Sequence, residues 1–377
     1  MLFARIGIVS YMEEEVQHVA SDVAKEQLLS HTISWLRFPL IVAIVLLHTF
    51  ILNRPVGGNV ITVDNAHLFA IFEHVTKADI GEIAVPLFFF ISGFLFFYNV
   101  TVFNKQIYVR KLKSRFRTLV VPYFLWNTLF LVYVAFLGWV MPSLLTFKKS
   151  FLTMEPLDVL NTYWELSQGL IPLWFIRDLI IINLFSWVIY WMLKPKYSAI
   201  ILFVFGLVFL SSKWHYIPGI GLRSSFPYML GAWFSIKKYN FIDLFYKYRY
   251  VLVTSFVLLV FGDTLLWMSG NSNFSVNRLC LLCGLITIPL LVAEGLIRGQ
   301  IHLQKWKEES SFFVYVFHMF IVHLPFVLLA RIIPLNDFTA TILQMAIPIM
   351  VAYICVMIYW ILKKTIPTMM KIAVGGR

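Results

Sequence analysis

The sequence predicts an all-α protein, a polytopic membrane helix bundle of about ten transmembrane helices with both termini in the cytoplasm. Of its 377 residues, 60% are hydrophobic and only 13% are charged, whereas a soluble domain carries about 25% charged residues. The hydrophobic residues form long continuous runs, which are typical of spanning helices and not of β-barrel strands, where apolar and polar residues alternate. We therefore expect an integral protein of a lipid bilayer.

Ten apolar segments account for the predicted helices. They cover residues 33–52, 82–98, 118–140, 171–192, 198–212, 222–236, 250–269, 279–297, 311–332 and 338–362. Because a crossing needs about 20 residues, the short segments 82–98, 198–212 and 222–236 are expected to be tilted, kinked or partly re-entrant. The chain shows no internal repeat, which disfavours a transporter built from inverted repeats.

The distribution of basic residues predicts the orientation. Of the 31 Lys and Arg residues, 21 lie in segments that are cytoplasmic if the N-terminus is inside, and 8 lie in outer segments. The positive-inside rule describes such an excess, and it explains the net charge of +12 without a nucleic-acid partner. We expect a cytoplasmic tail over 1–32, a transmembrane domain over 33–362 and a second cytoplasmic tail over 363–377.

Two cysteines, Cys280 and Cys283, form a CxxC pattern inside the apolar run LCLLCGLITIPLLV. No other metal ligand stands close to them in the sequence. We therefore interpret them as small apolar helix residues and predict no metal site.

The first apolar segment contains two ionisable residues, Arg37 and His48, in the stretch RFPLIVAIVLLH. Eleven steps of about 100° make three turns plus about 20°, so both side chains lie on nearly one helix face, about 16 Å apart along the axis. Arg37 is expected near the cytoplasmic end and His48 in the outer half of the membrane. The structural alternative is that Arg37 reaches the lipid headgroups and His48 makes a bundle contact.

Small residues and a basic stretch are candidates for binding a long anionic ligand. Ser92 and Gly93 interrupt the aromatic second segment, where they permit either close helix packing or the passage of a ligand. The stretch KQIYVRKLKSRFRTLVVPYFLW holds six basic residues within 13 positions, among them Arg110, Lys111, Arg115 and Arg117. These residues are either cytoplasmic membrane anchors or a phosphate site, because arginine matches phosphate geometry.

Charged residues inside apolar segments indicate function, because each costs about 2.5–3.5 kcal/mol on insertion scales. Arg177 and Asp178 lie in the fourth segment and Asp263 in the seventh. Adjacent residues of a helix do not face each other, so Arg177 and Asp178 are each expected to have another partner. His48 and Asp263, at similar depth, are the candidates. His318, in the ninth segment, is either a hydrogen-bonded core histidine or part of a site.

Several motifs occur in order: Arg-x10-His, FFFISGFLFF, the basic stretch leading to VVPYF, LWFIRDL and VYVFH. Together they make residues 33–362 resemble acyltransferase family three, the multi-pass membrane O-acyltransferases of bacterial envelope glycans. The resemblance implies about ten helices in the bacterial inner membrane. It also implies transfer of an acyl group, usually acetyl, from cytoplasmic acyl-CoA to a sugar hydroxyl of a polysaccharide or lipid-linked glycan.

The resemblance further implies that activity depends on Arg37 and His48, and that His318 belongs to the ninth-segment motif. The basic stretch and Arg37 are expected to hold the phosphates of acyl-CoA, and the pantetheine arm to pass Ser92 and Gly93. His48 is expected to act as general base on the acceptor hydroxyl. We assign Arg177 to the oxyanion. Four residues are expected around the substrate: Asp178, Trp174, Asp263 and His318.

No permanently bound cofactor is expected, because acetyl-CoA or another acyl-CoA enters as the donor substrate. The sequence leaves open which glycan accepts the group, whether the group is acetyl or succinyl, and the oligomeric state. A polytopic transporter or flippase of lipid-linked glycans is the alternative function.

Overall fold

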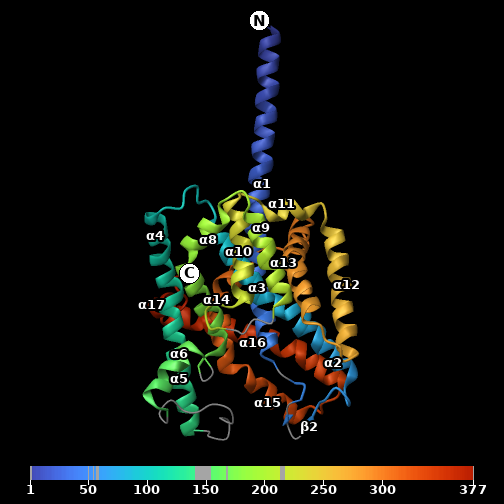
Figure 1. The fold of residues 1–377 in the computed structure, drawn as a ribbon. Coiled ribbons are helices and arrows are strands. Elements are labelled where there is room, and N and C mark those ends of the chain that lie inside the picture. The colour runs from blue at the N-terminus through green and yellow to red at the C-terminus, as the bar shows by residue number, and fades with distance from the viewer. Residues whose placement is uncertain are drawn as a thin grey trace.

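Helices form nearly all of the regular structure of the chain (Figure 1). The computed structural model describes residues 2–49, 51–53, 55–56, 59–140, 154–166, 169–212 and 217–376. The strands β1 (Pro55–Val56) and β2 (Asn59–Val60) pair antiparallel at the end of the bundle opposite the N-terminus. The predicted all-α class is therefore confirmed.

The helices and helical turns divide between the two halves of the chain. The first half contains α1 (Leu2–Leu47), α2 (His67–His74), the π-helical turn η1 (Val75–Ile80), the 3-10 turn η2 (Gly81–Ile83), α3 (Ala84–Phe97), α4 (Lys105–Arg115), the π-helical turn η3 (Phe116–Val120), α5 (Val121–Val140), α6 (Pro156–Trp164), the 3-10 turn η6 (Ile171–Leu173), α7 (Trp174–Leu184) and α8 (Ser186–Leu193). The second half contains α9 (Ser198–Ser211), α10 (Leu222–Ile236), α11 (Phe241–Tyr246), α12 (Arg249–Met268), α13 (Phe274–Ile297), α14 (Lys305–Ile321), α15 (His323–Ile332), α16 (Asp337–Thr365) and α17 (Pro367–Ala373).

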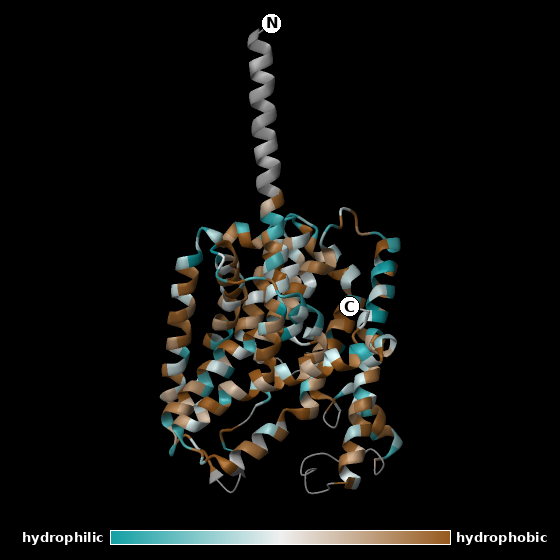
Figure 2. Cartoon of the chain, turned by 180° about the vertical axis from the view of Figure 1, so that it is seen from behind, coloured by the Kyte–Doolittle hydropathy of each residue, from teal (hydrophilic) through white to brown (hydrophobic). Residues whose placement is uncertain are grey.

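Several helices have the length and composition of membrane spans. Within the described residues, six qualify singly: Val23–Leu47, His67–Phe97, Lys105–Val140, Arg249–Met268, Phe274–Ile297 and Asp337–Thr365. The helices Ile171–Leu184 and Ser186–Leu193, bent by 63° to each other, make a seventh candidate if the two count as one span. Figure 2 shows hydrophobic residues along most of these helices. The multi-pass membrane prediction is confirmed, whereas the number ten and the orientation stay predictions.

The predicted starts of the second and third spans are wrong. The second span begins at His67, because α2, η1, η2 and α3 form one helical path through residues predicted to be a loop. The third begins at Lys105, because the basic stretch is the helix α4. Lys, Arg, Gln and Leu favour helix, and the Asn104 side chain caps α4 by accepting a hydrogen bond from the Ile107 amide at 2.9 Å.

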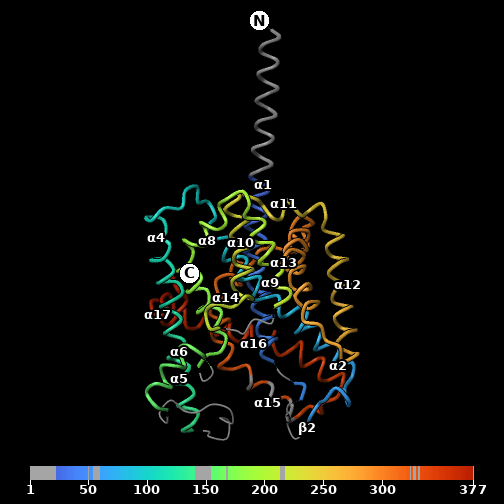
Figure 3. Tube along the Cα trace, in the orientation of Figure 1, coloured from blue at the N-terminus to red at the C-terminus, as the bar shows by residue number. Residues whose placement is uncertain are grey.

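Helices α3 and α10 pack backbone to backbone in the middle of the bundle, with α12 at one edge and α4 at the other (Figure 3). A Cβ atom at Gly93 would lie 2.0 Å from the Tyr228 carbonyl oxygen, and one at Gly231 would lie 1.9 Å from the Phe90 oxygen. Only glycine fits at such distances, and small residues at a helix interface allow this close approach. The close contact of α3 and α10 therefore fixes these two helices relative to each other.

Candidate active site

The residues around Arg37 form a cavity of about 350 Å³, which we call the Arg37 cavity. Its walls come from α1, α3, α7, α14 and the segment from Arg115 to Leu119. Arg37 and Arg115 supply positive charge, and Ser92 lines the wall from α3. Two acidic residues of α14, Glu308 and Glu309, also line it, and the Glu309 carboxylate pairs with Lys363 at 2.5 Å. The cavity therefore joins cationic and anionic side chains.

The residues around His48 form a second cavity of about 380 Å³, which we call the His48 cavity. Its walls come from the end of α1, the turns η1, η2 and η6, and the first residues of α3, α7 and α10. Lys77, Glu82 and Arg223 bring charge to it, and Trp174 closes one side. This cavity is thus polar as well as aromatic.

The two cavities adjoin each other, because Phe175 and Tyr315 line both. The rings of these two residues lie 6.0 Å apart, edge to face. The Tyr315 hydroxyl donates to the Pro172 carbonyl, which ties α14 to η6. Three residues of α1 at helical spacing line the pair of cavities, namely Arg37, Ile41 and Ile44, and His48 follows at the same spacing in the turn after α1. Arg37 and His48 therefore lie on one helix face, at the two cavities.

His48 occupies the turn that follows the last residue of α1. The predicted helix continues to residue 52, but in the structure it ends at Leu47, and the His48 amide donates to the Val45 carbonyl at 3.0 Å. The Thr49 hydroxyl also donates to Val45, at 3.1 Å. These bonds satisfy carbonyls that a helix end leaves open, and they fix the position of His48 beside the cavity.

A second histidine, His318, lies beside His48. The two ring centroids are 5.3 Å apart. His318 is fully buried, and its Nδ1 donates to the Tyr315 carbonyl at 2.8 Å, since a carbonyl oxygen can only accept. That bond fixes the orientation of the His318 imidazole. The structure thus brings together the first-segment and ninth-segment histidines.

The comparisons with known proteins agree with this arrangement. Residues 30–362 match the model of the Acyl_transf_3 family, described as an acyltransferase domain. The chain belongs to acyltransferase family 3. No curated protein and no solved structure matches the chain significantly. The molecule is therefore a multi-pass membrane acyltransferase, and the prediction of its family is confirmed.

In this acyltransferase, Arg177 and Asp178 bond to each other, so the expectation that these adjacent residues make no contact is wrong. Arg177 donates from Nε and from a terminal nitrogen to the Asp178 Oδ1, at 3.1 and 2.9 Å. It also donates to the Trp164 carbonyl, and the Gly219 amide donates to the same Asp178 oxygen at 2.9 Å. Neither residue is among the described residues that line the His48 cavity.

Asp263 also has a different partner from those predicted. Its Oδ2 lies 3.1 Å from the Nε2 of His74, at the end of α2. The prediction placed His74 in a loop, where it had no fixed distance from any helix. Because α2 is part of the second span, His74 lies against α12 instead.

The predicted donor-binding residues lie in different surroundings. Ser92 and Arg115 line the Arg37 cavity, whereas Gly93 lies against the α10 backbone and is not among the described residues that line the cavity; its contact with the donor stays a prediction. The Lys111 and Arg115 side chains both lie over the Phe96 ring, with Lys111 Nζ 5.1 Å from its centroid. The side chains of Arg110 and Arg117 are exposed.

Sequence reasoning missed three charged residues of the His48 cavity. Lys77 donates to the Glu73 carboxylate at 2.6 Å and to the Thr49 carbonyl, directly after His48. Arg223 pairs with Glu82 at 2.5 Å. The i,i+4 spacing of Glu73 and Lys77 was a visible helix signal, whereas nothing in the sequence pairs Glu82 with Arg223.

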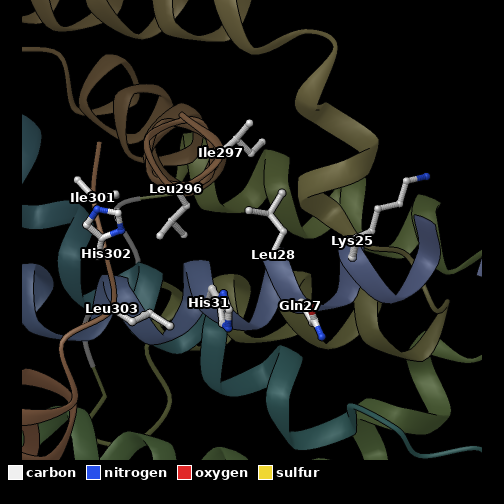
Figure 4. A pocket seen from close by; sticks show the side chains of 10 residues that line it. Lys25, Gln27, Leu28, His31, Leu296, Ile297, Ile301, His302 and Leu303 are labelled. Atoms are coloured by element: carbon white, nitrogen blue, oxygen red, sulfur yellow. The ribbon is translucent and has the colours of Figure 1, made fainter. Parts of the chain in front are cut away.

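A more open hollow of about 680 Å³ lies where α1 passes the end of α13 (Figure 4). His31 comes from α1 and His302 from the segment after α13, and apolar residues such as Leu28 and Leu296 line the same hollow. None of the predicted site residues is among the described residues that line it. This hollow is therefore separate from the candidate site.

Proposed function

We propose that this acyltransferase moves an acyl group, acetyl in the simplest case, from acyl-CoA to a sugar hydroxyl of an envelope polysaccharide or lipid-linked glycan. The observation that carries the proposal is the pair of adjoining cavities with Arg37 in one and His48 in the other. Acyl-CoA carries its phosphates at one end and its thioester at the end of the long pantetheine arm. Its binding therefore needs a cationic site and, at the distance of that arm, a reactive site. Arg37 and His48 are separated by about 16 Å of helix.

Arg37 and Arg115 hold the phosphates of the donor in the proposed complex. Both guanidinium groups belong to the Arg37 cavity, and charge-assisted hydrogen bonds to phosphate are stronger than neutral ones. The pantetheine arm passes Ser92 and reaches the His48 cavity between Phe175 and Tyr315, the two residues common to both cavities. Movement of these aromatic side chains opens the passage.

His48 acts as general base in the proposed reaction. Its imidazole takes the proton of the acceptor hydroxyl while the oxygen attacks the thioester carbonyl carbon. The tetrahedral intermediate then collapses, the carbon–sulfur bond breaks, and the imidazolium returns the proton to the CoA thiolate. The products are the O-acyl sugar and free CoA, and the buried ring of His318 orients the His48 ring.

Lys77 replaces Arg177 as the proposed cation at the oxyanion. Its ammonium belongs to the His48 cavity and is held by Glu73 and the Thr49 carbonyl. A preorganised donor at the developing oxyanion typically contributes a factor of about 10²–10³ to the rate. We further propose that the protein resides in the bacterial inner membrane and holds no permanent cofactor.

The test is acyl transfer by the full chain in lipid nanodiscs. With radiolabelled acetyl-CoA and an envelope glycan fraction, the wild type is expected to label the glycan. His48→Ala is expected to lower the turnover by about 10²–10⁴. The matched control is His302→Ala, which removes an exposed histidine of the separate hollow. Unchanged labelling by a correctly inserted His48→Ala protein would overturn the mechanism, and glycan translocation without labelling would favour a flippase.

A further inference from the structure

A buried cluster of potential metal ligands lies behind the wall of the His48 cavity. It consists of His74 at the end of α2, Asp79 in η1 and Asp263 in α12. One ligand atom from each residue lies within 4.8 Å of the others. Two of these atoms, the His74 Nε2 and the Asp263 Oδ2, are 3.1 Å apart. Three elements that are distant in the sequence thus meet at one point.

Asp79 is the member of the cluster that indicates a missing partner. Its side chain is 1% exposed, and neither of its carboxylate oxygens has a hydrogen-bond partner among the described residues. Burial of a carboxylate without a donor or a counter-charge is strongly unfavourable. A native protein keeps such a group only where something else satisfies it.

Nearby basic side chains do not supply that counter-charge in the described part of the chain. Lys77, two residues away, is engaged by Glu73 and the Thr49 carbonyl. Arg278 of α13 donates to the carbonyls of Phe209 and Ser212. Among the described residues, the only ion pair of Asp263 is with His74. Two buried carboxylates and one imidazole therefore share this space, and the described residues bring no further positive charge to Asp79.

We propose that His74, Asp79 and Asp263 bind a divalent transition-metal ion of the zinc class. Imidazole nitrogen and carboxylate oxygen are the ligands that zinc takes in proteins, at about 2.0–2.2 Å. Ligands at such lengths in a tetrahedral site stand about 3.3 Å apart, which is close to the present His74–Asp263 separation. A divalent ion also balances both carboxylate charges. The Trp267 ring, stacked on His74 at 4.6 Å and 15°, holds the imidazole in a fixed plane.

The proposed ion connects α12 to a turn that shapes the His48 cavity. In η1, Lys77 and Ala78 line the cavity, while Asp79 belongs to the metal cluster. The Ala78 carbonyl also accepts a hydrogen bond from Asn277 of α13, at 3.1 Å. Metal binding would therefore position Lys77 without contact to the reacting atoms. The three ligands are positioning residues, and the inference is independent of the proposed donor and acceptor.

Metal binding by the full chain in detergent micelles tests this inference. After treatment with a chelator, the wild type is titrated with Co²⁺ and then with Zn²⁺. We expect one equivalent of Co²⁺ to produce visible d–d absorption, Zn²⁺ to displace it, and the melting temperature to rise until one equivalent is bound. Asp79→Asn and Asp263→Asn, which keep the side-chain size, are expected to lose at least tenfold in affinity.

The matched control is Asp243→Asn, an aspartate of α11 whose exposed carboxylate pairs with Lys25. It is expected to bind metal like the wild type. Equal stoichiometric binding by Asp79→Asn and the wild type would overturn the assignment. A wild type whose melting temperature and spectrum do not respond to metal would overturn it as well, and would leave Asp79 as a protonated acid beside Asp263. Because this last measurement uses the wild type alone, it does not depend on the folding of a variant.

Discussion

The two adjoining cavities differ in how their walls are built. The Arg37 cavity is bounded mainly by regular helix, with α1, α3, α7 and α14 presenting side chains at helical spacing. The His48 cavity is bounded largely by irregular backbone, namely the end of α1 and the turns η1, η2 and η6, together with Pro86 and Pro172. The proposed chemistry thus lies where helices are interrupted, and the proposed donor site lies where they are continuous.

The physical reason is the freedom that an irregular turn gives to side-chain direction. A π-helical turn inserts one residue into the helical repeat, and such turns occur frequently at functional sites. In the π-helical turn η1, Lys77 lines the His48 cavity, while Asp79 lies beside Asp263 of α12. Gly81 then allows η2 to approach α1, because a Cβ there would lie 3.0 Å from the Leu47 side chain. Regular helices offer fixed faces, which suit the binding of an extended donor.

After the loss expected for His48→Ala, the largest expected effect belongs to Lys77, which lines the His48 cavity. Lys77→Met is expected to lower kcat by about 10²–10³, because it removes the proposed oxyanion donor, while the KM for acyl-CoA stays within about threefold. Steady-state kinetics in nanodiscs measure both values. Lys371→Met, an exposed lysine of α17, is the control. If Lys77→Met loses folded protein instead, its bonds to Glu73 and Thr49 are its main role.

A substitution in the Arg37 cavity is expected to change KM and not kcat, the opposite of the pattern expected for Lys77. Arg37→Gln is expected to raise the KM for acyl-CoA by about 10- to 100-fold, because hydrogen bonds to charged groups contribute about 1.5–3 kcal/mol. Its kcat at saturating donor is expected to change little. Lys371→Gln again serves as the control. A fall in kcat without a change in KM would show that both cavities take part in the chemistry, and the comparison would fail.

A substitution at the close contact of α3 and α10, beside the two cavities, is expected to lower the stability of the protein. Gly93→Ala places a methyl group 2.0 Å from the Tyr228 carbonyl oxygen, and overpacking of this kind costs about 1–3 kcal/mol. Thermal unfolding in detergent measures the loss. Gly262→Ala is the matched control, because no atom lies within 4 Å of the added carbon on α12. Equal melting temperatures for the two variants would show that α3 and α10 need no close contact.

The smallest expected effect lies at the Arg223–Glu82 pair of the His48 cavity. Its side chains are 43% and 35% exposed, and exposed ion pairs contribute little to stability. Arg223→Gln is therefore expected to leave the melting temperature unchanged and to change kcat/KM for the donor by less than about threefold. A larger change confined to the acceptor KM would assign Arg223 to acceptor recognition, and would sharpen the distinction between the two cavities.

Sequence reasoning predicted much of the site on α1 and little of the rest. The spacing of Arg37 and His48 was sufficient, because the relation between two residues of one helix follows from helix geometry alone. The prediction that Arg177 and Asp178 do not contact each other failed. It considered only the directions of the helix faces, whereas the arginine side chain is long enough to reach the adjacent carboxylate. The sequence could not predict that His74, Asp79 and Asp263 lie together, because their proximity depends on how α2 and η1 pack against α12.

By itself, the sequence determined the helical membrane class, the family and the common face of Arg37 and His48. Each of these follows from local composition, motif order or the repeat of a single helix. Only the tertiary structure decided that Lys77 belongs to the His48 cavity, that Gly93 contacts α10 and that Asp79 lies beside Asp263. Such contacts join segments far apart in the chain, and their geometry is set by packing and by the irregular turns between helices.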